Sequence, residues 1–96
     1  MTRTLEAPSR MGSRSQAAAL LHDLPTDLAG MVVEIVFDPG AYPTTSFLDE
    51  VIRSVLRDRG ARLLVFTNAN ERVVEIAEQS ADDLRVRARL TLNTAA

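Results

Sequence analysis

The chain has 96 residues, a formal net charge of −2, no cysteine and 11 basic residues that are all arginine. This composition excludes a disulfide framework and a thiolate metal site, and it gives no overall charge that attracts nucleic acid or an acidic membrane. No apolar run approaches the roughly 20 residues that span a bilayer, and the N-terminus lacks the apolar segment of a secretory signal. We therefore expect a cytoplasmic protein with one domain and neither a membrane nor a nucleic-acid partner.

The first third of the chain predicts a short helix followed by a strand. Ser13 and Gln16 have the spacing of a capping box, and an apolar stripe follows them to Pro25. Residues 31–38 alternate, with apolar side chains at every second position, which is typical of a strand. Residues 1–12 form an N-terminal segment in which "RTLEA" suits one short strand. The domain proper is expected over residues 13–92, with a tail at 93–96.

The strongest helix signal covers residues 46–59. Its apolar residues recur at helical spacing: Phe47, Leu48, Val51, Ile52, Val55 and Leu56. Ser46 followed by Asp49 three residues later predicts that Ser46 caps the helix, which leaves Thr45 as the more accessible hydroxyl. Gly60 is the expected stop signal.

The last third predicts a strand, a helix and a final strand. Residues 61–68 are almost continuously apolar, as in a central strand, and residues 70–81 form a helix capped by Asn68 or Asn70. Residues 84–92 alternate and predict a strand with Arg85, Arg87 and Arg89 on one wet face. Because guanidinium groups do not suit a helix layer, we expect a two-layer α/β sandwich. Its sheet has about four parallel or mixed strands, with helices mainly on one face.

Most catalytic and cofactor sites have no counterpart in this sequence. The only histidine is His22, the four glycines stand apart, and no GxSxG turn is present. We expect neither a cofactor, a metal nor enzymatic activity. The arginine row of the last strand has two interpretations: a weak anion site, or charges that discourage pairing at a sheet edge.

The hydroxyl-rich segment "VVEIVFDPGAYPTTSFLDEVI" resembles the STAS-like domain family, relatives of anti-sigma-factor antagonists. In that family an apolar strand ends near an Asp, here Phe37-Asp38, and a hydroxyl element opens the next helix, here Thr44 to Leu48. The segments "GSRSQAAALL" and "ARLLVFTNANERVVEIAEQS" are similar to the flanking elements, so the resemblance covers roughly residues 10–92. Thr44 stands where the family usually has Asp, and Phe47 where it usually has Gly.

The resemblance implies a non-catalytic regulatory module that binds a protein. The family's antagonists are phosphorylated at this helix start by a serine kinase with a histidine-kinase-like ATPase fold. Alignment of the apolar stripe puts Thr45 at the modified position, with Ser46 beside it. The implied partner is such an ATPase or an anti-sigma factor. The residues expected to bind it are Asp38, Thr44, Thr45, Ser46, Asp49 and Glu50.

Two alternatives stay open at this point. The hydroxyl cluster is equally well explained as a helix cap that is never modified. A different class of function is a small ligand-binding or enzymatic domain that uses the strand-end loops near Asp38 and Asn68, where open α/β sheets hold their ligands. A deep polar pocket at Asp38, Thr44 and Asn68 would favour that class, whereas a flat surface would favour partner docking.

Overall fold

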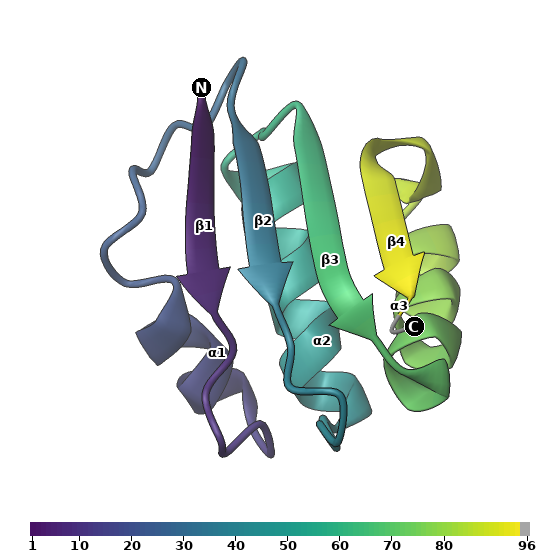
Figure 1. Cartoon of the computed structure of the whole chain (residues 1–96). Helices are drawn as coiled ribbons and strands as arrows, with labels where there is room; N and C mark the ends of the chain where they lie inside the picture. The colour runs from purple at the N-terminus through teal and green to yellow at the C-terminus, as the bar shows by residue number, and fades with distance from the viewer. Residues whose placement is uncertain (95–96) are drawn as a thin grey trace.

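The computed structural model describes residues 1–94 and shows a four-stranded parallel sheet covered on one face by three helices (Figure 1). The strand order in the sheet, β1-β2-β3-β4, follows the order in the chain. The elements are β1 (Thr2–Glu6), α1 (Arg14–Leu20), β2 (Val32–Val36), α2 (Thr45–Ile52), η1 (Arg53–Asp58), β3 (Leu63–Ala69), α3 (Glu71–Asp83), η2 (Arg87–Arg89) and β4 (Leu90–Thr94). Within residues 1–94, no helix has the length and apolar content needed to cross a bilayer.

The strand order explains why the fold has two layers. Crossovers between parallel strands are right-handed in nearly all proteins. Three successive crossovers that advance in the same direction across the sheet therefore place their helices on the same face. The predicted two-layer sandwich is confirmed, with an all-parallel sheet of four strands.

The core lies between the sheet and the helices. Alternation in β2 sends Val33 and Ile35 towards the helices, and β3 contributes Leu64 and Phe66 in the same way. The predicted apolar stripe of α2 is fully buried against them. The expected strand in the N-terminal segment is confirmed as the edge strand β1, and the apolar 61–68 segment is confirmed as the inner strand β3.

The predicted strand over residues 84–92 is wrong in its first six residues. Arg85 has a positive φ of 60°, and the next residues make a 3₁₀ turn, so β4 starts only at Leu90. Val86 and Leu90 are buried on either side of the turn, but Ala88 between them is exposed, so the predicted alternation of burial is broken there. The wet arginine face that led to the layer prediction therefore does not exist. β4 runs to Thr94, so the expected tail loses residues 93–94 to the sheet, and residues 95–96 lie outside the described part.

The helix predicted over residues 46–59 begins at Thr45 and changes its winding midway. From Arg53 to Asp58 it is a π-helix, in which the backbone N–H of Arg59 donates to the carbonyl of Ser54, five residues back, at 2.9 Å. The carbonyl of Leu56 accepts instead from the guanidinium of Arg89 at 2.7 Å. Gly60 follows with a φ of 69° and supplies the predicted stop.

Candidate functional site

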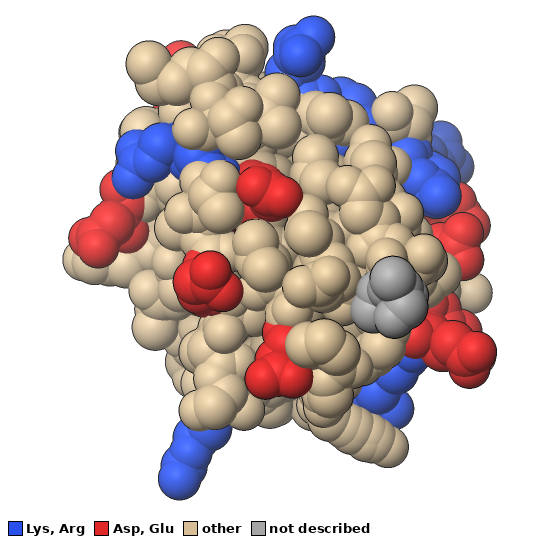
Figure 2. Space-filling model, in the orientation of Figure 1, with Lys and Arg blue, Asp and Glu red and all other residues tan. Residues whose placement is uncertain are grey.

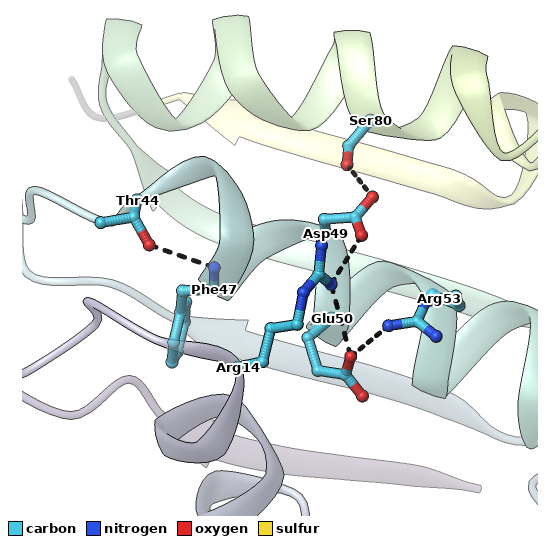
Figure 3. Close-up of polar contacts among 7 residues, drawn as sticks. All are labelled: Arg14, Thr44, Phe47, Asp49, Glu50, Arg53 and Ser80. Atoms are coloured by element: carbon cyan, nitrogen blue, oxygen red, sulfur yellow. Dashed lines mark hydrogen bonds and ion pairs between the residues drawn. The ribbon is translucent and has the colours of Figure 1, made fainter.

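The start of α2 is capped by Thr44, and the prediction that Ser46 is the cap is wrong. The Thr44 hydroxyl accepts a hydrogen bond from the backbone N–H of Phe47 at 3.2 Å (Figure 3). The backbone N–H of Thr44 donates to the carbonyl of Met11 at 2.9 Å, which holds the residue in the extended conformation that a cap requires. The predicted pairing of Ser46 with Asp49 does not form, because Asp49 bonds to other helices.

The cap lies two residues before the predicted one, so the hydroxyl of Ser46 is free as well as that of Thr45. Thr45 and Ser46 are the first two helical residues, and both are exposed. Within the described chain, neither hydroxyl makes a hydrogen bond. The first turn of α2 thus presents two adjacent, unengaged hydroxyls, and removing either one leaves the cap in place. The structure therefore separates capping from any role in modification or binding.

Asp49 connects all three helices. Its carboxylate accepts from the guanidinium of Arg14 in α1 at 2.8 Å and from the hydroxyl of Ser80 in α3 at 2.9 Å (Figure 3). Partial burial acts to raise the pKa of Asp49, but the hydrogen bonds from Arg14 and Ser80 outweigh it and hold that pKa below its usual value. Asp49 is therefore a brace beneath the first turn, and its predicted contact with a partner stays a prediction.

Glu50 completes this helix brace. Its carboxylate pairs with Arg14 at 3.5 Å and with Arg53 one turn further along the helix (Figure 3). Sequence reasoning identified the two acids but missed Arg14 and Ser80, which lie 35 residues before and 31 residues after Asp49. No local spacing reveals such partners, because they meet only when α1 and α3 pack against α2.

The strand-end loops are held closed by their own polar groups. Asp38 accepts from the backbone N–H of Gly40 at 3.0 Å, and Asn70 donates to the carbonyls of Pro39 and Ala41 at 3.0 and 2.7 Å. Asn70 also caps α3, so it rather than Asn68 fills the predicted cap position. These polar groups satisfy loop backbone instead of pointing into a shared hollow, which weighs against a ligand site here.

Asp38 and Asn68 are nevertheless both exposed at the carboxyl ends of neighbouring strands. Asn68 has a φ of 59°, a left-handed conformation that Asn tolerates better than most residues. Thr44, the third residue of the alternative site, points its hydroxyl into the cap described above and towards Met11. Asp38 and Thr44 thus already bond to nearby backbone groups, and the three side chains do not form a convergent polar set.

A groove of about 620 Å³ runs between α2 and α3 beside the free hydroxyl of Thr45. Its walls carry more acidic than basic side chains, and Ile76 adds an apolar surface. The charged residues that line it are Asp49, Glu71, Arg72, Glu75 and Asp83.

Arg72 fixes the loop that leads into this groove. Its guanidinium lies 3.8 Å from the centre of the Tyr42 ring, and its Nε donates to the carbonyl of Pro43 at 2.8 Å. Tyr42 is 66% exposed, so Arg72 holds a large aromatic residue at the surface next to the start of α2. Hydroxyls, an exposed aromatic ring and an acidic groove therefore lie along one surface.

The three C-terminal arginines do not form the predicted anion-binding row. Arg89 donates to the carbonyls of Ala61 and Leu56, and Arg87 pairs with Glu78 at 3.5 Å and donates to the carbonyl of Leu90. Only Arg85 is exposed. Two of the three guanidiniums thus stabilise the fold, because they donate hydrogen bonds to backbone carbonyls and one of them pairs with a carboxylate.

Comparison with models of protein families, with curated proteins and with solved structures finds no match for this chain. In residues 1–94, no three His, Asp or Glu side chains are placed to hold a metal ion.

Proposed function

We propose that this domain is a non-catalytic regulatory module that binds a protein partner at the surface formed by the first turn of α2 and the α2–α3 groove. The observation that carries the proposal is the pair of exposed, unengaged hydroxyls at Thr45 and Ser46, next to the capping residue Thr44. We further propose that phosphorylation of Thr45 switches binding. The partner class, a histidine-kinase-like ATPase or an anti-sigma factor, rests on the family resemblance.

The arrangement of the first turn suits a switch that leaves the fold intact. Thr44 provides the cap, so modification of Thr45 removes no bond that holds α2. A phosphate adds about −1.5 to −2 charges at pH 7, and the positive end of a helix tolerates such a group. Thr45 also lines the groove, and Ser46 is not among the residues that line it. Charge at Thr45 therefore changes the docking surface most directly.

The expected effect of the phosphate is release of the partner. An interface that buries a neutral hydroxyl cannot bury a group of nearly two negative charges unless the partner supplies a cation. The groove itself carries mostly carboxylates, so it offers the phosphate little compensation beyond Arg72. Unmodified protein is the form that binds, and modified protein is the form that is released.

The direct test uses purified histidine-kinase-like ATPases encoded by the same genome. Incubation with ATP followed by phosphopeptide mapping should place phosphate on Thr45 and leave a Thr45→Ala variant unmodified. Pull-down with the same ATPases should recover wild type and not Thr45→Glu. Thr26→Glu, which adds the same charge at an exposed threonine in the α1–β2 connection, is the matched control and should bind like wild type. Equal binding by all three proteins, with no phosphate on residues 44–46, would leave the hydroxyls without a regulatory role.

A further inference from the structure

The face of the sheet that the helices do not cover forms a regular grid, which we name the open face. The strand register aligns Thr4, Glu34, Val65 and Thr91 in one row across the sheet. The row on one side has Thr2, Val32 and Leu63, and the row on the other has Glu6, Val36, Thr67 and Asn93. Four of these eleven residues are apolar, two are acidic and none is basic.

Glu34 lies at the middle of the open face and is held there from both sides. One of its carboxylate oxygens accepts from the hydroxyl of Thr4 at 3.1 Å, and the other accepts from the hydroxyl of Thr67 at 2.6 Å. Figure 2 looks onto this face and shows a mainly tan surface with red side chains within it, while the blue side chains lie mostly towards the outline. A fixed negative charge is thus surrounded by apolar and hydroxyl groups.

An all-parallel sheet is normally covered on both faces, because its strands are rich in β-branched and apolar residues. Here the helices cover only one face, and Val32, Val36, Leu63 and Val65 remain partly accessible on the other. Apolar patches rimmed by polar residues mark interaction sites on soluble proteins. We propose that the open face is a docking site for one amphipathic helix of a protein partner, whose polar side brings an Arg or Lys to Glu34.

The charge of the open face argues against a second copy of this chain as the occupant. Covering the face removes water from Glu34, and a buried carboxylate is unfavourable unless a cation or further donors pair with it. A second copy docked face to face would supply another Glu34 and another Glu6, and no basic residue from its own grid. A helix with basic side chains flanking an apolar stripe supplies both a cation for Glu34 and an apolar surface for the valines and Leu63.

The size of the face also fits one helix. Five residues along a strand span about 17 Å, and four strands about 4.8 Å apart span about 14 Å. That footprint is well below the roughly 800 Å² per partner of a standard stable interface. A helix of about 12 residues is about 18 Å long and about 10 Å wide, which matches the grid. The site lies across the sheet from the α2–α3 groove, so it is independent of the function proposed above.

The test uses two synthetic amphipathic helical peptides that share a Leu stripe and differ only in flanking residues, Arg in one and Glu in the other. Wild type should bind the Arg peptide about tenfold more tightly than the Glu peptide, as measured by titration calorimetry at two salt concentrations. Glu34→Arg should reverse that preference, and an unfolded variant cannot produce such a gain. Glu34→Gln should remove most of the preference for the Arg peptide. Val65→Asp should lower the affinity for both peptides.

The matched control is Glu75→Arg, which makes the same change of charge in the α2–α3 groove. It should leave the preference for the Arg peptide within about twofold of wild type. If Glu75→Arg reverses the preference as Glu34→Arg does, or if backbone amide shifts on binding fall on α2 and α3 rather than β2 and β3, the proposal is wrong. A dimer in sedimentation equilibrium that Val65→Asp abolishes would also overturn it, because the occupant would then be a second copy.

Discussion

The two ends of the long helix formed by α2 and η1 satisfy their backbone groups in different ways. At the start, Thr44 caps the amide of Phe47, three residues away in sequence. At the end, Arg89 reaches the carbonyl of Leu56 from 33 residues away, and it also binds the carbonyl of Ala61. The start is capped by a local side-chain hydrogen bond, whereas the end adds to its local backbone hydrogen bonds a long-range one that exists only in the assembled fold.

This difference determines what each end is free to do. A local cap uses one side chain and leaves its neighbours Thr45 and Ser46 exposed, so the proposed modification at the start of α2 would not remove the cap. A long-range cap ties the end of η1 to the segment that leads into β4. Substitutions at the start should therefore act on binding more than on folding, whereas substitutions at the end should act on folding.

The largest expected effect lies between the two ends, at Ile52. Its side chain is fully buried at the junction of α2 and η1. Ile52→Ala should lower the free energy of unfolding by about 2–5 kcal/mol, because it removes apolar contacts and leaves a cavity. Ile76→Ala, on the half-buried side of α3, is the control and should have a smaller effect in the same thermal or denaturant melt. An equal loss of unfolding free energy in both variants would show that Ile52 is not at the centre of the core.

Arg89→Met tests the long-range cap. Methionine retains an unbranched apolar stem, but it removes the charged donors to the carbonyls of Leu56 and Ala61. The free energy of unfolding should fall by about 1–3 kcal/mol, measured by urea denaturation. Arg57→Met removes an exposed guanidinium that lies near Arg89, at the end of η1, and should change stability by less than about 0.5 kcal/mol. If the two variants are equally stable, the end of η1 does not depend on Arg89.

The same distinction explains which parts of the molecule the sequence predicts. Period-two and helical patterns predict β2, β3 and the apolar stripe of α2. Single residues before a helix predict two caps, Ser13 for α1 and Asn70, one of the two candidates, for α3. All of these signals are local in sequence. The alternation over residues 84–92 predicts one continuous strand, but a 3₁₀ turn interrupts it and exposes Ala88, and no period-two pattern indicates such a turn.

The prediction of the candidate site was limited in the same way to signals that are local in sequence. The hydroxyl cluster was found from its position before an apolar helix, but its capping residue was placed two residues too late. Asp49 has a good capping spacing from Ser46, and only the packing of three helices shows that Arg14 and Ser80 bind it instead. The acid-lined groove and the open face depend on strand order and helix packing, which no spacing along the chain encodes.

A comparison of the stabilities of Thr44→Ala and Ser46→Ala tests the local cap. Loss of the Thr44 hydroxyl leaves the Phe47 amide without its partner, so the free energy of unfolding should fall by about 0.5–2 kcal/mol. Ser46→Ala and Thr45→Ala should change it by less than about 0.5 kcal/mol, because both side chains are exposed and unengaged. Thr44→Ser preserves the cap and serves as the matched control in the same melts. A larger loss for Ser46→Ala than for Thr44→Ala would restore Ser46 as the cap.

The smallest expected effect is the pH dependence of the helix brace at Asp49. Its pKa is lower in the folded protein than its unfolded value of about 3.9, because the hydrogen bonds from Arg14 and Ser80 together outweigh burial. A lowered carboxyl pKa contributes stability that is fully present above about pH 4 and is lost as the pH falls through the folded value. Since the pair with Arg14 is partly exposed, the contribution should be about 1 kcal/mol or less.

Asp49→Asn removes this charge and retains a side chain of similar shape. The difference in unfolding free energy between wild type and Asp49→Asn should therefore be largest near pH 6–7 and shrink below about pH 4, because protonation of Asp49 then makes the two proteins alike. Asp58→Asn, which removes one negative charge at an exposed carboxylate outside the helix brace, is the matched control in the same series. Wild-type and Asp49→Asn curves that stay parallel down to pH 2.5 would mean that the ionised carboxylate of Asp49 does not hold the three helices together, and that the start of α2 is positioned by its cap and its apolar contacts alone.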